Sequence, residues 1–327
     1  MVSIQVMSTS LVIWIASTLL GTCHALSSIV PPDISQSPAG TFFASHFPKT
    51  RSQLGPNELF LTHLEVNGFL LSTADRTILI DPLLEGPLDF GLSSSIYQGS
   101  KRVLPEYGLT ECLPPRIDCV LITQGLGDHA HLPTLQKLKT KFPMIIIVAP
   151  PSARATLQKA GFVGNNVRYI RPGQDTKIFP DTYSASRLTI RATQGALVGP
   201  PWQARENGYI VTGPNSPSIY TEPHVEFQKK ALEQLPPVDV VISPISGQGL
   251  SGFELVHGPQ ETLKLCHILK PRYLVPIANG ELHTSGALSP FIEEIGSARE
   301  FRELLKDSGL ETKLVDISPG KDIRVTV

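Results

Sequence analysis

Three side chains that could bind a metal ion fall within four positions of one another: Asp128, His129 and His131. They follow Ile117–Ile122, an apolar run whose length and β-branched content predict a buried strand. Imidazole nitrogens and carboxylate oxygens are ligands for zinc, iron or manganese. The alternative interpretation is an ordinary polar loop, in which Asp128 caps the helix that follows.

Further candidate donors also follow predicted strands. Glu222 and His224 flank a proline after the strand expected at 218–221, and Asp81 ends the strand expected at 77–80. Either these residues join the first group around one metal ion, or they are ordinary turn residues. Their chemistry therefore depends on whether the fold brings the loops together.

Composition sets the broad class of protein. The chain has 327 residues, of which 41% are apolar and 17% charged, and this is enough apolar material for a large core. A formal net charge of −1 gives no reason to expect a nucleic-acid partner. Cys23, Cys112, Cys119 and Cys266 form no Cys-x-x-Cys pair, so neither a disulfide framework nor a thiolate zinc site is expected.

The N-terminal segment differs from the rest of the chain. Leu11–Gly21 is an apolar run of signal-peptide length, and small residues allow cleavage after Ala25. Residues 26–56 are rich in Ser, Pro and Thr, which is typical of a transit-type extension or a disordered linker. We expect delivery to a plastid through a secretory-type leader, or else secretion or an endomembrane lumen, with no stable membrane span after the leader is removed.

Residues 57–327 carry short predicted elements in a mixed order. Hairpin-like strands come first, around Asn67-Gly68, and strands alternating with helices follow from residue 117. Further strands are expected over 167–221, followed by a second alternating stretch and a long amphipathic helix from Phe291 to Leu305. This order predicts one domain built as a four-layer α/β/β/α sandwich, with a doubly wound parallel sheet as the alternative.

One glycine pattern matches the spacing of a dinucleotide-binding loop but not its position before a helix. Gly247, Gly249 and Gly252 spell Gly-x-Gly-x-x-Gly, but Phe253–Gly258 separates them from the next predicted helix. A dinucleotide-binding loop opens directly into a helix, so dinucleotide binding is not expected.

The layout of residues 57–327 resembles the metallo-β-lactamase fold. That family carries an early aspartate, which Asp81 matches, and a His-x-His-x-Asp-His motif, whose last two members match Asp128-His129. The chain departs from the pattern at the first two histidines, where Gln124 and Leu126 stand. It departs again where the family has a bridging aspartate, here Glu222.

The chain is also similar to a divergent branch of that fold in photosynthetic bacteria and plastids. The shared segments are the Gln-Gly-Leu-x-Asp-His-x-His loop, Gly199–Gln203 and Glu222–His224. The branch usually has an acidic residue before the aspartate, where this chain has Gly127.

The resemblance implies a metal-dependent hydrolase with one divalent ion, zinc, iron or manganese, acting on a small ester, thioester, lactone or phosphoester. The implied ligands are drawn from Asp128, His129, His131, Glu222 and His224. Asp81 and Gln124 would support them, and Asp128 would accept a proton from the attacking water. Trp202, Arg205, Glu206 and Asn207 line a possible substrate mouth or form one packed loop. The alternative function is a degenerate member of the fold that binds a partner or metabolite without chemistry.

Overall fold

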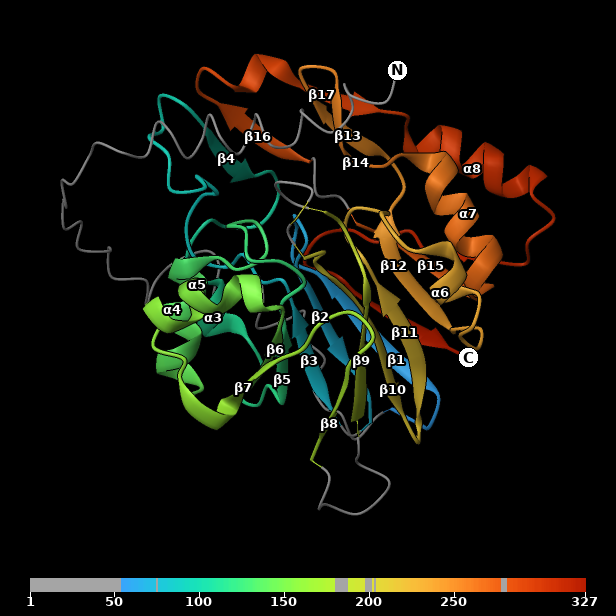
Figure 1. The fold of residues 1–327 in the computed structure, drawn as a ribbon, viewed down its shortest axis with the longest axis horizontal. Helices are drawn as coiled ribbons and strands as arrows, with labels where there is room; N and C mark the ends of the chain where they lie inside the picture. Colours follow the sequence, from blue (N-terminus) through green and yellow to red (C-terminus); the bar gives the residue numbers. More distant parts are fainter. Residues whose placement is uncertain (1–53, 75, 180–187, 198–201, 203, 278–280) are drawn as a thin grey trace.

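The computed structural model describes residues 54–74, 76–179, 188–197, 202, 204–277 and 281–327. The expected signal peptide and residues 26–53 of the expected extension lie outside the described residues. Two seven-stranded sheets form the centre of the molecule, and the helices lie on their outer faces (Figure 1). In the described part of the chain, no helix is long and apolar enough to cross a membrane.

The first sheet changes from antiparallel to parallel pairing along its width. Its strands, in spatial order, are β19 (Asp322–Thr326), β1 (Glu58–His63), β2 (Phe69–Ser72), β3 (Thr77–Ile80), β5 (Cys119–Leu121), β6 (Ile146–Ala149) and β7 (Val167–Tyr169). Pairing is antiparallel from β19 to β3 and parallel from β3 to β7. The carboxyl ends of β3 and β5 therefore point to the same edge of the sheet.

The second sheet has the same mixed character. Its strands, in order, are β18 (Lys313–Leu314), β15 (Tyr273–Ile277), β12 (Val240–Pro244), β11 (Ser216–Thr221), β10 (Asn207–Gly213), β9 (Leu188–Gln194) and β8 (Asp175–Ile178). The sequence predicts that the strand at 167–170 belongs to this second group, but the prediction is wrong, because β7 pairs with β6 in the first sheet.

The helices cover the outer face of each sheet. Against the first sheet lie α3 (Leu109–Cys112), α4 (Leu132–Lys141) and α5 (Arg154–Lys159), with the short 3₁₀ turns Pro151–Ala153 and Gly164–Asn166. Against the second lie α6 (Lys229–Leu232), α7 (Pro259–Leu269) and α8 (Ala298–Asp307). A third apolar core, which includes Leu61, Phe69 and Ile242, fills the space between the sheets. The predicted α/β/β/α sandwich is therefore confirmed.

Two small sheets were not predicted. One pairs β4 (Gln98–Lys101) with β16 (Leu282–Ser285), and the other joins β13 (Gly247–Leu250), β14 (Phe253–Val256) and β17 (Ile292–Ile295). The glycine pattern at 247–252 is thus a β-hairpin that does not open a helix.

The long helix expected from Phe291 to Leu305 is wrong in its first half. Residues 289–291 form a 3₁₀ turn, and β17 follows. Gly296 then adopts a left-handed φ of 72°, and Ser297 caps α8 by accepting a hydrogen bond from the Glu300 N–H at 3.1 Å. The glycine and the cap residue together start a new helix where apolar spacing alone suggested continuity.

The turn between β1 and β2 also differs from the prediction. The tight Asn67-Gly68 turn expected from the sequence is a longer loop over residues 64–68, because His63 pairs with Phe69. Glu65 and Val66 adopt left-handed φ values of 64° and 53°. This loop directs the side chain of Asn67 toward Asp128 and His129, which follow the carboxyl end of β5.

Candidate active site

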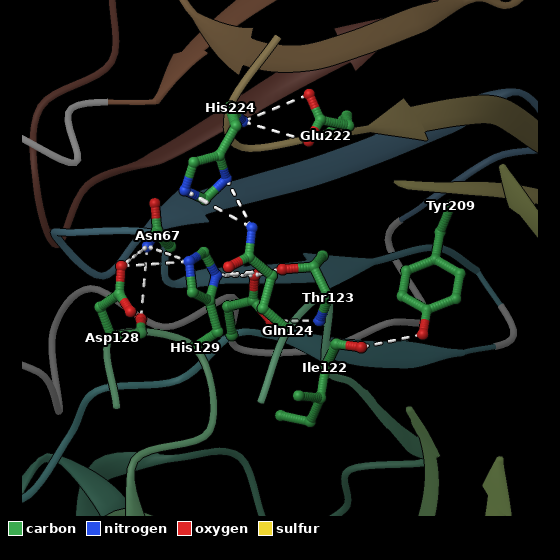
Figure 2. A network of polar contacts seen from close by, with 10 residues as sticks. Asn67, Ile122, Thr123, Gln124, Asp128, His129, Tyr209, Glu222 and His224 are labelled. Carbon is green, nitrogen blue, oxygen red and sulfur yellow. Dashed lines mark hydrogen bonds and ion pairs between the residues drawn. The ribbon is translucent and has the colours of Figure 1, made fainter. Parts of the chain in front are cut away.

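A network of polar side chains lies where the ends of β3, β5 and β11 meet (Figure 2). Asp81 directly follows β3, and the 123–131 loop begins two residues after β5. Parallel neighbours end at one edge of a sheet, so these two groups are brought together. Glu222 and His224 arrive from the end of β11 in the second sheet.

His129 lies between two carboxylates. Its Nδ1 is 2.8 Å from Asp81 Oδ2, and its Nε2 is 3.1 Å from Asp128 Oδ2. Thr123 fixes the first carboxylate by donating its backbone N–H to Asp81 Oδ1 at 2.8 Å and its hydroxyl to Oδ2 at 2.5 Å. The imidazole orientation is thus set by Asp81, and Nε2 is aimed at Asp128.

The two carboxylates control the protonation of His129. Burial disfavours the charged form of His129, but the carboxylates of Asp128 and Asp81 outweigh it and raise its pKa to about 10. Burial likewise opposes ionisation of Asp128, yet His129 beside it holds the pKa of that carboxyl below its usual range. In the absence of another cation, a proton on His129 thus neutralises part of the negative charge.

His224 forms the opposite wall of the network. Its ring centre lies 5.3 Å from that of His129, and its Nδ1 is 2.7 Å from Gln124 Nε2. Burial and the charge of His129 lower the pKa of His224 to about 3, so it is neutral at physiological pH. With the Gln124 amide placed so that Nε2 faces the ring, Nδ1 accepts its hydrogen bond, and this favours the tautomer whose proton is on Nε2.

Glu222 is close in the chain but its carboxylate is occupied. It accepts the backbone N–H of His224 at 3.2 Å and that of Glu226 at 2.9 Å. Burial raises the pKa of Glu222 to about 8 against the effect of these bonds. These hydrogen bonds to Glu222, an expected ligand, shape the turn that presents His224.

His131 belongs to a separate network. Its Nδ1 is 2.9 Å from Thr134 Oγ1, a hydroxyl that already accepts the backbone N–H groups of Leu84 and Glu85. The hydroxyl hydrogen is thus left to donate to Nδ1, and the imidazole also hydrogen-bonds the backbone of Pro87. These two partners of the imidazole, Thr134 and Pro87, are not members of the His129 network.

The residues expected to line a substrate mouth differ in their exposure and in their hydrogen-bond partners. The Trp202 side chain is 83% exposed, whereas Asn207 is buried and donates to the Ile170 carbonyl at 2.9 Å. Arg205 forms an ion pair with Glu226 and donates to the Gly195 carbonyl at 3.1 Å. Glu206 is also buried and accepts the Ser152 hydroxyl at 2.7 Å.

Sequence reasoning missed two parts of this region. Asn67 was interpreted only as a turn residue, yet its Nδ2 lies 3.3 Å from His129 Nε2. Phe90 and Tyr97 form an aromatic pair with ring centres 5.5 Å apart, and the charge of Asp128 contributes to raising the Tyr97 pKa to about 12, after burial. No motif marked these residues, because they come from loops whose positions depend on the whole fold.

The donor atoms around His129 decide whether the site suits the divalent ion that the fold implies. Among the residues described, no three or more His, Cys, Asp and Glu side chains form a group able to hold a metal ion. However, Asn67 Oδ1, Gln124 Oε1 and Asp128 Oδ1 are buried oxygens without a hydrogen-bond partner. Buried acceptors without donors suit a cation. These oxygens and the Nε2 of His129 are therefore the atoms of the described residues that could take part in holding a cation.

The fold and the network define a metallo-hydrolase-like α/β/β/α protein. Residues 60–278 match the family described as the beta-lactamase superfamily domain. The chain belongs to this superfamily. No protein with a curated description matches it.

Solved structures agree on the fold. A metallo-hydrolase from the archaeon Ignicoccus hospitalis is 16% identical with a TM-score of 0.57, covering 83% of this chain and 99% of its own. An isothiocyanate hydrolase from Delia radicum gut bacteria is 18% identical with a TM-score of 0.57, covering 82% and 99%. The diiron β-hydroxylase CmlA from Streptomyces venezuelae is 15% identical with a TM-score of 0.53, covering 83% and 55%. At these identities the likeness establishes the fold alone.

Proposed function

We propose that this protein is a metal-dependent hydrolase with a single altered metal site that acts on a small ester, thioester, lactone or phosphoester. One observation carries the proposal: His129 lies between Asp81 and Asp128, and Asp128 retains a buried oxygen without a partner. Superfamily membership and the metal-dependent hydrolases among the solved neighbours support this general class.

Asp128 and His129 would hold the ion. Two donors that share one zinc ion lie roughly 3–3.5 Å apart, and the separation of His129 Nε2 and Asp128 Oδ2 is 3.1 Å. Because Asp81 engages Nδ1, Nε2 is the nitrogen that would hold the ion, which would displace the proton of His129. When bound, the ion would supply a water of lowered pKa and polarise the substrate.

The other side chains have separate tasks in this mechanism. The free oxygen of Asp128 accepts the proton of the attacking water. The Nε2–H of His224 donates to the oxygen on which negative charge develops, and Gln124 holds that ring in place. The Asp128 side chain is 19% exposed while His129 is fully buried, so substrate would approach from the Asp128 side.

A second candidate function is a metal-free binding protein on the same fold. Its support is the absence, among the described residues, of a three-ligand cluster of His, Cys, Asp and Glu. In that case the charge of the two carboxylates would be balanced by the His129 proton alone.

Metal analysis of the purified full chain separates the two functions. The hydrolase proposal expects about one transition-metal ion per chain after dialysis against zinc, manganese or iron, and its loss in His129→Ala. His267→Ala is a matched control, because that histidine is exposed on α7. A folded protein that retains no ion in either form would favour the binding protein. A panel of esters, thioesters, lactones and phosphodiesters then identifies the substrate class.

We also propose a cellular destination for this chain. Residues 1–56 would direct the chain into a plastid as a two-part leader, with secretion or an endomembrane lumen as the alternative. A fluorescent protein fused behind residues 1–56 tests this directly. A diffuse cytosolic signal would contradict both destinations.

A further inference from the structure

We infer that Phe90 forms a binding wall beside Asp128 for an uncharged aromatic group of the substrate. The inference rests on the proposed function and narrows its substrate class to esters and thioesters that carry an aromatic ring. Binding of the ring precedes the chemistry, so it can be measured without a metal ion and without hydrolysis.

The side of the site from which substrate would approach carries exposed apolar residues. Asp128 is the partly exposed member of its pair with His129. Phe90 packs against the residue before Asp128, since a Cβ at Gly127 would lie 3.5 Å from Phe90 Cδ1. Phe90 is 41% exposed, and Leu126, two positions before Asp128, is 37% exposed. A substrate that approaches Asp128 therefore meets apolar groups first.

The Phe90 ring belongs to an aromatic pair next to Asp128. Its centre lies 5.5 Å from that of Tyr97, and the two ring planes are tilted by 42°. Tyr97 is anchored in a buried apolar cluster with Leu88 and Val66. Burial and, after it, the charge of Asp128 raise the pKa of Tyr97 to about 12, so the phenol stays neutral. A flat ring that stacks on Phe90 would extend this pair, and aromatic contacts stabilise beyond the burial of apolar area alone.

The backbone at Phe90 is unfavourable for its residue type. Its φ of 53° is left-handed, a conformation that bulky side chains rarely adopt and that asparagine adopts more readily. Asp89 holds the turn, because its Oδ1 accepts the Gly91 N–H and its carbonyl accepts the Leu92 N–H, both at 2.8 Å. Core packing does not explain a phenylalanine here, since the residue is exposed. A strained residue beside a candidate active site instead favours a contact with ligand.

The charges near Phe90 indicate which kind of ring is accepted. Asp89 precedes it in the chain, and Asp128 follows the glycine that it packs against. Both carboxylates are negative at neutral pH, and they would repel an anionic ring such as that of an aryl carboxylate. The uncharged ring of an aryl ester meets no such repulsion.

Binding of prodan to the full chain, with a metal chelator present, tests the inference. Prodan is an uncharged naphthyl ketone that is not hydrolysed, and its emission shifts to the blue in an apolar environment. The wild type should bind it with this shift, and Phe90→Asn should raise the Kd at least about tenfold. Because asparagine suits the left-handed backbone, the urea midpoint of Phe90→Asn should equal or exceed that of the wild type.

Met144→Asn is the matched control. Met144 is an exposed apolar residue that precedes β6, whereas the site lies at the carboxyl ends of the parallel strands β3 and β5. It therefore lies at the opposite edge of the first sheet, and its replacement should leave the Kd for prodan unchanged.

Gly127→Asp provides a second variant that keeps Phe90 in place. Its Cβ would make only ordinary contact with the Phe90 ring, but its carboxylate would add a charge beside that ring. This variant should also raise the Kd for prodan. An unchanged Kd in Phe90→Asn or Gly127→Asp, or a wild type that gives no blue shift, would overturn the inference. The proposed function would still stand, because neither metal nor hydrolysis enters this measurement.

Hydrolysis then tests the substrate class itself. For naphthyl acetate relative to methyl acetate, the ratio of kcat/KM values should fall about tenfold in Phe90→Asn and stay unchanged in Met144→Asn. An equal ratio in Phe90→Asn would overturn the narrowed substrate class. A wild type that binds prodan through Phe90 but hydrolyses no member of the panel would overturn the proposed function and keep Phe90 as a ligand contact.

Discussion

The Asp81 carboxylate lies 2.8 Å from Nδ1 of His129, across the junction of two parallel strands. Asp81 itself has a left-handed φ of 39°, which turns the chain at the end of β3. Its two oxygens also accept the backbone N–H and the hydroxyl of Thr123. One carboxylate therefore ties the end of β3 to the loop after β5 and fixes the histidine proposed to hold the metal.

Replacing Asp81 by asparagine should weaken metal binding by about 10- to 100-fold, because His129 loses the charged partner that orients its ring. The exposed Asp175 in β8 is the matched control, and Asp175→Asn should bind as the wild type does. Competition titration with Zn²⁺ checks both variants, with circular dichroism to verify the fold. Equal affinities would show that Asp81 has no role in positioning the ligand.

His224→Ala should lower kcat/KM by roughly a hundredfold toward whichever panel substrate is hydrolysed, since a donor to the developing oxyanion is removed. Bound metal should remain at the wild-type level. Activity and metal content are measured on the same preparations. A loss of metal along with activity would instead identify His224 as a ligand.

Two neighbouring glycines in the motif loop should respond differently to alanine. A Cβ at Gly125 would lie 2.7 Å from the backbone carbon and oxygen of Ser152, whereas a Cβ at Gly127 would make ordinary contact with Phe90 at 3.5 Å. Gly125→Ala should lower the free energy of unfolding by about 1–3 kcal/mol. Gly127→Ala should leave it nearly unchanged. Urea unfolding measures both, and equal midpoints would contradict the packing of this loop against Ser152.

His63 should make stability depend on pH. It is buried against Phe69, with ring centres 4.7 Å apart, and burial lowers its pKa to about 4. The unfolded chain, with an ordinary histidine pKa near 6.5, therefore binds more protons between these values. The stabilisation is complete above about pH 6.5 and is lost as the pH falls to about 4, a change of about 3 kcal/mol.

The variant His63→Phe isolates this effect, because it retains an aromatic ring against Phe69 but cannot titrate. Between pH 7 and pH 4, its free energy of unfolding should fall by about 3 kcal/mol less than that of the wild type. Urea unfolding at several pH values provides the comparison. Parallel pH profiles would show that the pKa of His63 is the same in the folded and the unfolded chain.

Local sequence patterns were sufficient to predict the sandwich architecture. Apolar runs and helix periodicity predicted nearly all strands of the two large sheets, because burial on a sheet face imposes a pattern on neighbouring residues. Apolar spacing failed from Phe291 onward, where Gly296 and Ser297 interrupt the pattern. The small sheets escaped prediction because their short strands carry little periodic signal.

The sequence predicted only part of the candidate site. The sequence placed Asp81 and Asp128-His129 at the ends of two predicted strands, and parallel pairing of those strands brings them together. It could not assign partners to Glu222, which binds backbone N–H groups, or to His131, which binds Thr134. The partner of a carboxylate or imidazole depends on which groups surround it in space.

Asn67 marks the division most clearly. The sequence determined that a turn lies at this asparagine, since Asn-Gly between apolar runs is a local signal. Only the tertiary structure decided that the turn lengthens and carries the carboxamide to His129, more than sixty positions away. Hydrophobic patterning is written in neighbouring residues, whereas a binding site is made of contacts between distant ones, and those exist only after the sheets have packed.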